Sequence, residues 1–321
     1  MAQAPGRPDA RSLVIAGKTA AADGVAVLTL ARPSGRRLPD WTPGAHLDLV
    51  LPGGLTRQYS LCGDRWDAYR YRVAVLREPA GRGGSGYVHD QLQVGDLVGW
   101  GGPRNGFPLV PSQAYLFIAG GIGITPLLPM IAQADLLDAD WTLLYAGRSL
   151  ASMAFLDELS GYGDRVRLTP GDAGGRLDLN PWLGAPRPGV KVYCCGPSRL
   201  LDAVAGICAG WPRYSLRTER FEPKAAASNA GDAAFEVELR RSGAQVTVAP
   251  GVSVLDAARR AGATVLSSCE RGVCGTCETA VVAGRPDHRD SLLDDDERSR
   301  GDCMYICVSR AAAGSRLVLD L

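Results

Sequence analysis

Hydrophobic and polar residues alternate in short runs over the first third of the chain. Proline and glycine clusters separate four clear runs, at residues 25–30, 46–51, 70–76 and 97–100. Alternation with a period of two is typical of strands whose two faces meet different surroundings. The pattern predicts an all-β barrel or sandwich between Leu13 and about Pro108.

From Tyr115 onward, buried strands alternate with segments of helical periodicity. Residues 115–119 predict a strand, residues 127–137 a helix and residues 141–145 a second strand. Later runs predict helices and strands in the same alternation, at residues 154–159, 166–168, 190–194 and 199–209. This order predicts a small parallel sheet with helices on its faces.

A third pattern follows a stretch after Glu222 that lacks large apolar residues and is typical of a linker. Residues 235–241 and 245–248 alternate as a hairpin, with Ser242-Gly243 at the turn. Residues 253–261 predict a helix that begins at a serine N-cap and stops at a glycine. We therefore expect a third domain that begins near Phe235.

The cysteines of this third domain have a spacing that carries chemical meaning. Cys269, Cys274 and Cys277 form a C-x4-C-x2-C pattern, and Cys307 follows after 29 further residues. This spacing is typical of plant-type 2Fe-2S clusters, in which a loop supplies three thiolates and a neighbouring element the fourth. The four cysteines are therefore the predicted iron ligands.

This prediction has alternatives for the kind of site and for the fourth ligand. A structural zinc site or simple burial of the thiols would also use cysteines, but a shared middle cysteine does not fit the paired knuckles usual for zinc. Cys303 competes with Cys307 as fourth ligand, and residues 304–308 predict a strand. Gly272 and Gly275 would allow the loop to curl and point backbone N–H groups at sulfur atoms.

A glycine turn after the first strand of the central domain predicts a nucleotide site. Residues 120–126 read Gly-Gly-Ile-Gly-Ile-Thr-Pro and open a helix, where unpaired N–H groups can meet a pyrophosphate. A second strand ends in Cys-Cys-Gly-Pro (194–197), which leaves the same sheet edge open. The alternative is an ordinary tight connection. The candidate nucleotide-binding residues are Gly120, Gly121, Gly123, Cys195, Gly196 and Pro197.

Two features of the first domain suit a flavin. Arg57 and Tyr59 fall on one face of a predicted strand, and residues 81–86 (Gly-Arg-Gly-Gly-Ser-Gly) could surround a phosphate. Taken singly, they also fit an exposed barrel face and a flexible hairpin tip. Hydride transfer delivers two electrons together whereas a 2Fe-2S cluster accepts one, so a chain with both sites needs a flavin to separate them. We expect Tyr59 against the flavin ring, and Arg57 and Ser85 on its phosphate.

Together these motifs resemble the phthalate dioxygenase reductase family, the reductases of two-component Rieske oxygenases. The likeness spans almost the whole chain, through RQYSLCG (57–63), REPAGRGGS (77–85), PRNGFPL (103–109), AGGIGITP (119–126), YCCGP (193–197), SSCERGVCGTC (267–277) and CVSRA (307–311). It implies an all-β FMN-binding barrel over 1–110, an NAD-binding α/β domain over 111–221, a linker over 222–233 and an α+β (β-grasp) 2Fe-2S ferredoxin domain over 234–321.

The resemblance also implies roles for individual residues. The family's flavin-binding segments correspond to Arg57, Tyr59, Ser60, Gly83, Gly84 and Ser85. At the place of hydride transfer it implies Thr125 near flavin and nicotinamide, Cys195 at the nicotinamide, and Phe221 as the aromatic that shields the flavin. The local sequence Thr-Glu-Arg-Phe departs from the family's Phe-Glu-x-Phe, so an ordinary boundary aromatic is the alternative for Phe221.

The composition and the net charge of the chain exclude some classes of protein and of binding partner. The chain has 321 residues, of which 46% are apolar and 21% charged, as in folded multidomain proteins. Its 35 basic and 34 acidic residues leave a net charge of +1, which argues against binding to nucleic acid or to a membrane surface. There is no secretory signal pattern or long apolar stretch. We expect a cytoplasmic protein, and the resemblance implies a monomer.

The expected activity is electron transfer from NADH through FMN and a 2Fe-2S cluster to a separate terminal oxygenase, with a Rieske non-haem iron oxygenase of aromatic compounds as the favoured acceptor. The alternative is a reductase for a cytochrome P450 or another monooxygenase, with FAD as the alternative flavin. Arg148 could bind a 2′-phosphate, which leaves NADPH as a minority alternative to NADH. A non-catalytic electron carrier is the alternative from another functional class.

Overall fold

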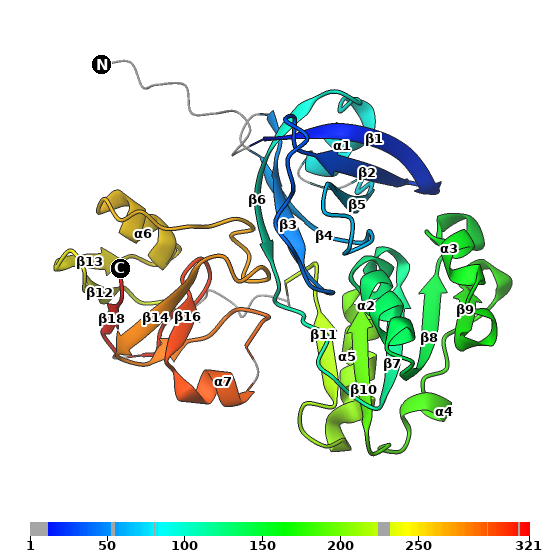
Figure 1. Ribbon diagram of the computed structural model, residues 1–321. Coiled ribbons are helices and arrows are strands. Elements are labelled where there is room, and N and C mark those ends of the chain that lie inside the picture. The colour runs from blue at the N-terminus through cyan, green and yellow to red at the C-terminus, as the bar shows by residue number, and fades with distance from the viewer. Residues whose placement is uncertain are drawn as a thin grey trace. The chain divides into compact units, whose positions relative to one another are not determined.

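The computed structural model describes residues 12–52, 55–79, 81, 83–223, 232–293, 295–313 and 315–321. The chain divides into two compact units, and the division falls between Arg220 and Phe221 (Figure 1). Arg82 of the expected phosphate loop and residues 224–231 of the expected linker lie outside the described residues. The proposed boundaries at residues 110, 221 and 233 stay predictions.

The first unit begins with the antiparallel barrel that the alternating pattern predicts. Its strands, in the sheet order β4-β3-β6-β1-β2-β5, are β1 (Ser12–Ala22), β2 (Val25–Ala31), β3 (His46–Val50), β4 (Thr56–Ser60), β5 (Arg70–Leu76) and β6 (Leu97–Arg104). A bridge between Leu61 and Val73 joins the two end strands and closes the sheet. Alternate side chains such as Leu28 and Leu30 are fully buried in its core, as the period of two requires.

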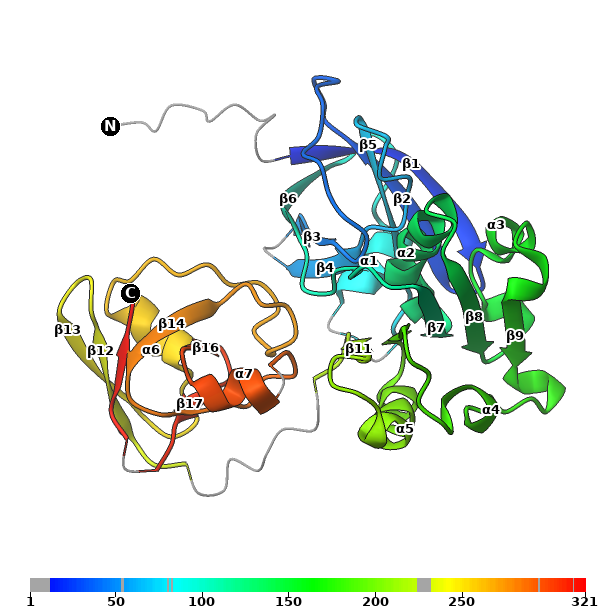
Figure 2. The ribbon, with the colours of Figure 1, turned by 60° about the horizontal axis from the view of Figure 1, so that its bottom comes forward.

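The same unit continues into a five-stranded parallel sheet in the order β11-β10-β7-β8-β9. Its strands are β7 (Ala114–Gly120), β8 (Asp140–Gly147), β9 (Val166–Pro170), β10 (Val190–Cys195) and β11 (Leu216–Glu219). In Figure 2, α2 (Ile124–Leu136) lies on one side of the sheet, and α4 (Asn180–Leu183) and α5 (Ser198–Ile207) lie on the other. The parallel α/β prediction is confirmed.

Short helices complete the first unit. The sequence pattern did not predict α1 (Gly84–Asp90), which begins inside the glycine-rich segment, or β11, because both are too short to show periodicity. The remaining helical elements are α3 (Leu156–Ser160) and the 3-10 turns η3 (Gly121–Gly123), η4 (Leu150–Ser152), η5 (Gly163–Arg165), η6 (Gly171–Ala173) and η7 (Cys208–Gly210).

The second unit is a mixed sheet in the order β13-β12-β18-β14-β16, with a separate β15–β17 pair. Its elements are β12 (Phe235–Leu239), β13 (Ala244–Val248), α6 (Val254–Arg260), β14 (Glu278–Ala283), β15 (Pro286–Asp287), α7 (Asp295–Arg300), β16 (Cys303–Tyr305), β17 (Arg310–Ala311) and β18 (Leu317–Leu319). Strands β12 and β18 are parallel, whereas the other paired strands are antiparallel. The predicted hairpin and the α+β class are confirmed.

Two local predictions in this unit have different outcomes. Ser253 caps α6, since its hydroxyl accepts a hydrogen bond from the Asp256 backbone N–H at 3.0 Å. The predicted strand at 304–308 is wrong beyond Tyr305, where β16 ends and the chain turns. Cys307 therefore lies on a turn, which lets its thiol reach toward the other cysteines instead of alternating along a strand.

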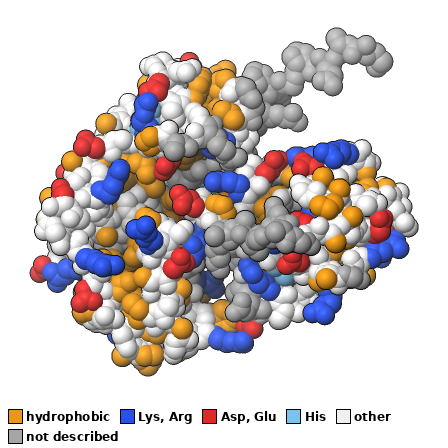
Figure 3. All heavy atoms as spheres, turned by 180° about the vertical axis from the view of Figure 1, so that it is seen from behind, with side chains coloured by type: hydrophobic (Ala, Val, Ile, Leu, Met, Phe, Trp, Pro, Cys, Tyr) orange, Lys and Arg blue, Asp and Glu red, His pale blue; other side chains and the backbone are white. Residues whose placement is uncertain are grey.

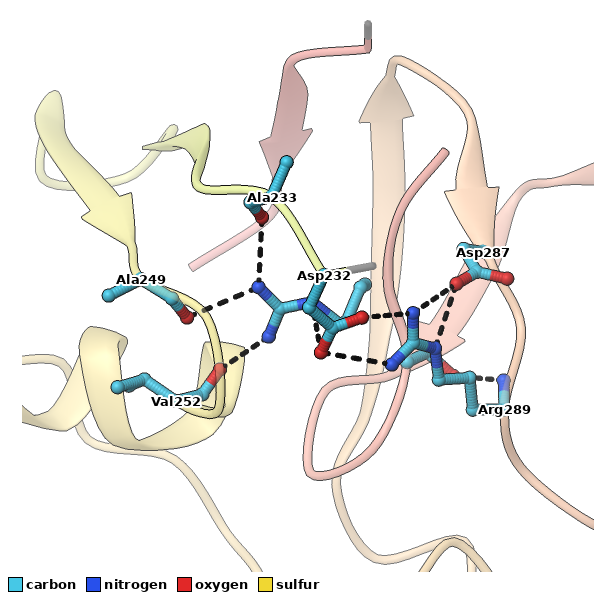
Figure 4. A network of polar contacts seen from close by, with 8 residues as sticks. Asp232, Ala233, Ala249, Val252, Asp287 and Arg289 are labelled. Atoms are coloured by element: carbon cyan, nitrogen blue, oxygen red, sulfur yellow. Dashed lines mark hydrogen bonds and ion pairs between the residues drawn. The ribbon is translucent and has the colours of Figure 1, made fainter. Parts of the chain in front are cut away.

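A buried polar network surrounds Asp232, eleven residues after the start of the second unit (Figure 4). The Asp232 carboxylate, whose side chain is 5% exposed, accepts a 2.7 Å hydrogen bond from Arg289 Nη2 and lies 3.4 Å from Arg310 Nε. Arg310 also donates to the carbonyl groups of Val252, Ala249 and Ala233. These contacts join Asp232 to β17 and to the turn before α6.

The surface carries mixed charge. On the face seen in Figure 3, basic and acidic side chains are interspersed on both units. This distribution agrees with the near-zero net charge. Over the described residues, the helices are all too short or too polar to cross a lipid bilayer.

Candidate functional site

The carboxyl ends of β7 and β10 meet at one edge of the parallel sheet, and glycines allow the turns there to pack closely. A Cβ atom on Gly120 would lie 2.6 Å from the Pro197 Cδ atom and 3.4 Å from the Gly196 Cα atom. A Cβ atom on Gly123 would lie only 2.2 Å from the Cys195 carbonyl oxygen. The structure therefore brings these five predicted residues together at one place.

The turn between β7 and α2 is also suited to an anion. Gly121 has a φ of +54°, and no atom lies within 4 Å of the position a Cβ would take there. Helix α2 continues directly from the 3-10 turn η3, and the Ile124 N–H donates to the Gly121 carbonyl oxygen. No side chain caps either element, so the N–H groups of the glycine turn itself are the ones that could meet an anion. Thr125 is 2% exposed and its hydroxyl donates to the Ile122 carbonyl oxygen at 2.9 Å, which fixes the side chain beside the turn.

Glu219 is a residue of this edge that the sequence did not predict. The parallel register of β10 and β11 sets it opposite Cys195, and its Oε2 atom lies 4.0 Å from Cys195 Sγ. Burial raises the pKa of the Glu219 carboxyl to about 8. Burial, and then the neighbouring Glu219, raise the pKa of the Cys195 thiol well above its ordinary value. At neutral pH both groups are therefore mostly uncharged, and the thiol can donate to the carboxyl.

This raised pKa predicts how stability depends on pH. The unfolded chain releases the Glu219 proton near its ordinary value of 4.5, whereas the folded chain holds it up to about 8. Between these values the folded state binds more protons, so the free energy of unfolding falls as pH rises. We expect Glu219→Gln to remove this part of the dependence. Urea unfolding of both proteins at several pH values from 4.5 to 9 measures it, and a constant offset between them would contradict the prediction.

The predicted flavin residues of the barrel lie on β4 and at the start of α1. A Cβ atom on Gly84 would lie 2.7 Å from Arg57 Nε, so the guanidinium packs directly over this glycine. The N-cap of α1, Gly83, has a φ of +82°, and the Ser85 hydroxyl accepts a hydrogen bond from the Glu78 N–H at 3.1 Å. The structure thus brings a cation, a glycine turn and a hydroxyl together, as a phosphate site requires.

Tyr59 and Ser60 follow Arg57 along β4. Burial raises the pKa of Tyr59 to about 12, which keeps the phenol neutral, and its ring packs against the barrel core. Ser60 is 5% exposed and pairs with His46 across β3 and β4. The Cα atoms of η3 lie within 8 Å of those of β5. The predicted flavin and nucleotide residues therefore belong to one unit in which the barrel adjoins the glycine turn.

The four predicted iron ligands come in two pairs. The Cys269 thiol donates to Cys274, which lowers the pKa of Cys274 to about 5 and raises that of Cys269. In the same way a hydrogen bond from Cys307 lowers the pKa of Cys277. Among the described residues, no three or more His, Cys, Asp or Glu side chains are arranged to hold a single metal ion. Two pairs of thiols fit a two-iron cluster, in which each iron takes two cysteines.

The loop around these cysteines also has the expected backbone. Gly272 and Gly275 have φ values of +69° and +78°. The Arg271 N–H donates to Cys269 Sγ at 3.3 Å, and the Thr276 N–H donates to Cys274 Sγ at 3.4 Å. Such N–H groups stabilise the negative charge of a reduced cluster.

Exposure distinguishes the cysteines from one another. Cys274, Cys277 and Cys307 are buried at 8%, 3% and 8% exposure, whereas Cys269 is half-buried. Cys303 lies in β16, and burial raises the pKa of its thiol to about 11. Because Cys307 and not Cys303 pairs with Cys277, the geometry favours Cys307 as the fourth ligand.

Phe221 is the first residue of the second unit and is half-buried. Its carbonyl oxygen accepts a hydrogen bond from Arg271 Nη2 at 3.4 Å. The shielding role that the resemblance implies for Phe221 stays a prediction.

Comparisons with known proteins agree with this arrangement. The model of a 2Fe-2S iron-sulfur cluster binding domain matches residues 237–312, which include all four predicted ligands. The chain is 45% identical to the phenoxybenzoate dioxygenase subunit beta of Ectopseudomonas oleovorans, over 94% of both chains. The structure of phthalate dioxygenase reductase matches with a TM-score of 0.70 and 38% identity over 97% of both chains. An intact type IV self-sufficient cytochrome P450 monooxygenase matches with a TM-score of 0.91 and 43% identity, over 97% of this chain and 41% of that one.

Proposed function

Because the chain belongs to the phthalate dioxygenase reductase family, we propose that it passes electrons from NADH through FMN and a 2Fe-2S cluster to a separate Rieske non-haem iron oxygenase. Membership of the family makes the chain an NADH-dependent oxidoreductase of an oxygenase system. It also accounts for the flavin- and NAD-binding fold and the 2Fe-2S domain. FMN as the flavin, and a Rieske oxygenase as the acceptor, are the proposal.

The observation that carries the proposal is the presence of three complementary sites in one chain. The barrel offers Arg57 and the glycine turn at Gly83 for a flavin phosphate. The sheet edge offers the glycine turn before α2, which no side chain caps, for a dinucleotide, and the second unit offers paired cysteines for two irons. A bound flavin would accept two electrons from NADH and release them singly, which is what the cluster needs.

The residues of the chain supply binding and orientation. Arg57 and Ser85 would hold the flavin phosphate and Tyr59 would lie against its ring. The turn at 120–125 would hold the pyrophosphate of NADH, and Cys195 with Thr125 would set the place of its nicotinamide. Cys269, Cys274, Cys277 and Cys307 would hold the irons. No general acid or base is needed for these steps.

A second candidate acceptor has its own support. The chain matches 41% of a self-sufficient cytochrome P450 monooxygenase with a TM-score of 0.91. A cytochrome P450 is therefore the alternative electron acceptor, and FAD the alternative flavin.

Anaerobic titration with NADH tests the proposed function. The flavin and iron-sulfur absorption bands are followed together, and the released flavin is identified by chromatography. We expect both chromophores to bleach and the flavin to be FMN. Activity with purified Rieske oxygenases and P450s then separates the acceptors. A protein that shows neither chromophore after reconstitution with FMN, iron and sulfide would refute the proposed function.

Arg57→Gln is expected to weaken flavin binding. The substitution removes a cation packed on Gly84 beside the proposed phosphate position. Hydrogen bonds to charged groups contribute about 1.5–3 kcal/mol, so the flavin Kd should rise by about 10- to 100-fold. Flavin fluorescence titration of the deflavinated protein measures the change. Arg70→Gln, at an exposed arginine of β5 in the same barrel, is the matched control and should bind flavin as the parent does.

A further inference from the structure

Two consecutive residues at the junction of the units are held by side chains of different units. The Arg220 side chain is 8% exposed and forms an ion pair with Asp202 of α5, in the first unit. The next residue, Phe221, belongs to the second unit and accepts its hydrogen bond from Arg271. The chain is therefore anchored on each side of one peptide bond.

Arg271 has a second connection, to the cluster ligands. It lies in the loop between Cys269 and Cys274, and its backbone N–H donates to Cys269 Sγ at 3.3 Å. A single residue thus contacts both a predicted iron ligand and the Phe221 carbonyl group. The Nε atom of Arg271 is buried and has no hydrogen-bond partner among the described residues, so the contact to Phe221 is made by the end of the guanidinium alone.

The contact between Arg271 and Phe221 matters because Phe221 lies two residues after the end of β11. Glu219 ends β11 opposite Cys195, at the sheet edge where NADH would react. Only Arg220 separates Glu219 from Phe221, and two peptide units span at most about 7 Å. The Arg271 side chain therefore attaches the cluster loop to a point two residues beyond that edge.

We propose that Arg271 is a positioning residue for electron transfer from the flavin to the cluster. By holding Phe221 against the loop that carries Cys269, it shortens the length of free chain between that loop and the end of β11. In the transfer that Arg271 would support, the reduced flavin would give up one electron and one of the two ferric ions of the cluster would become ferrous, with NADH as the source of the electron pair. The inference rests on the proposed function.

Rapid mixing with NADH under anaerobic conditions tests this role. Flavin bleaching reports hydride transfer, and the cluster signal, by absorption and by freeze-quench electron paramagnetic resonance, reports the following step. We expect Arg271→Ala to slow reduction of the cluster by about tenfold or more, as small misplacements of reacting groups do, with flavin bleaching unchanged. Arg271→Lys, which keeps a donor on a long side chain, should restore part of the rate.

Arg259→Gln is the matched control. Arg259 also contacts the cluster loop, through Glu270 and Ser267, but no contact with Phe221 is found for it in the described structure. It should leave both rates unchanged, whereas an equal slowing in Arg259→Gln and Arg271→Ala would overturn the inference by pointing to loss of positive charge. Unchanged cluster reduction in Arg271→Ala, or slowed flavin bleaching, would overturn it too. A cluster that stays oxidised in the parent protein would instead refute the proposed function.

Discussion

Cys307→Ser is expected to remove the cluster and, with it, electron delivery to one-electron acceptors. Cys307 is 8% exposed and pairs with Cys277 in the core of the second unit. Serine is a poor iron ligand that keeps its proton at neutral pH, so one iron would lose half of its protein ligands. Loss of a residue that only supports a ligand costs about 10- to 100-fold, and loss of the ligand itself should cost more.

Iron content, the absorption spectrum and cytochrome c reduction measure this effect. NADH oxidation with ferricyanide, which can take electrons directly from a flavin, should persist and show that the first unit is intact. Cys303→Ser is the matched control, because Cys303 lies four residues earlier on β16 and outside both cysteine pairs. A cluster lost in Cys303→Ser and kept in Cys307→Ser would reverse the assignment.

Gly123→Ala is expected to destabilise the first unit and to disrupt its nucleotide edge. The added Cβ would lie 2.2 Å from the carbonyl oxygen and 2.5 Å from the carbonyl carbon of Cys195. Both are backbone atoms, so α2 or the end of β10 must move. Overpacking of this kind costs about 1–3 kcal/mol, and a cost at the upper end would lower the Tm of a unit of this size by about 6–12 °C. NADH should also bind more weakly, because the displaced turn would carry the pyrophosphate.

Thermal unfolding and NADH titration of the purified protein test this expectation. Gly206→Ala is the control, since Gly206 lies inside α5 with no atom within 4 Å of its added Cβ. Alanine is the better helix former by about 0.5–1 kcal/mol, so this variant should be slightly more stable than the parent. If the Gly123→Ala protein has the parent's Tm and NADH affinity, the close packing of Gly123 against Cys195 is needed neither for stability nor for NADH binding.

Much of the fold could be predicted because long elements repeat their pattern several times. The strand at 115–119 and the helix at 127–137 were expected and appear as β7 and α2. Helix α1 and strand β11 escaped because each contains too few repeats of its period to stand out in the sequence. The strand expected at 304–308 failed because apolar residues on a turn beside buried thiols look the same in sequence as residues on a strand.

The candidate site also has features that the sequence predicts and features that arise only from the fold. The cysteine spacing and the two glycine segments are local motifs, and the structure brings each set together. The pairing of Cys269 with Cys274 and of Cys277 with Cys307 depends on folding of the loop. Glu219 could not be found in the sequence, since its place beside Cys195 comes from the register of two strands separated by α5. Its carboxyl acquires a pKa of about 8 only through burial.

The network around Asp232 determines at which residue the iron-sulfur module can be separated from this reductase and fused to another protein. A ferredoxin module that started at Phe235, where its first strand begins, would lack the carboxylate that faces Arg289 and Arg310. The Arg310 side chain is 7% exposed and would keep only carbonyl partners. A buried cation that loses its anionic partner is destabilising, so this shorter module should be less stable than one that keeps Asp232. A graft or gene fusion that moves the iron-sulfur module to another protein should therefore carry Asp232 with it.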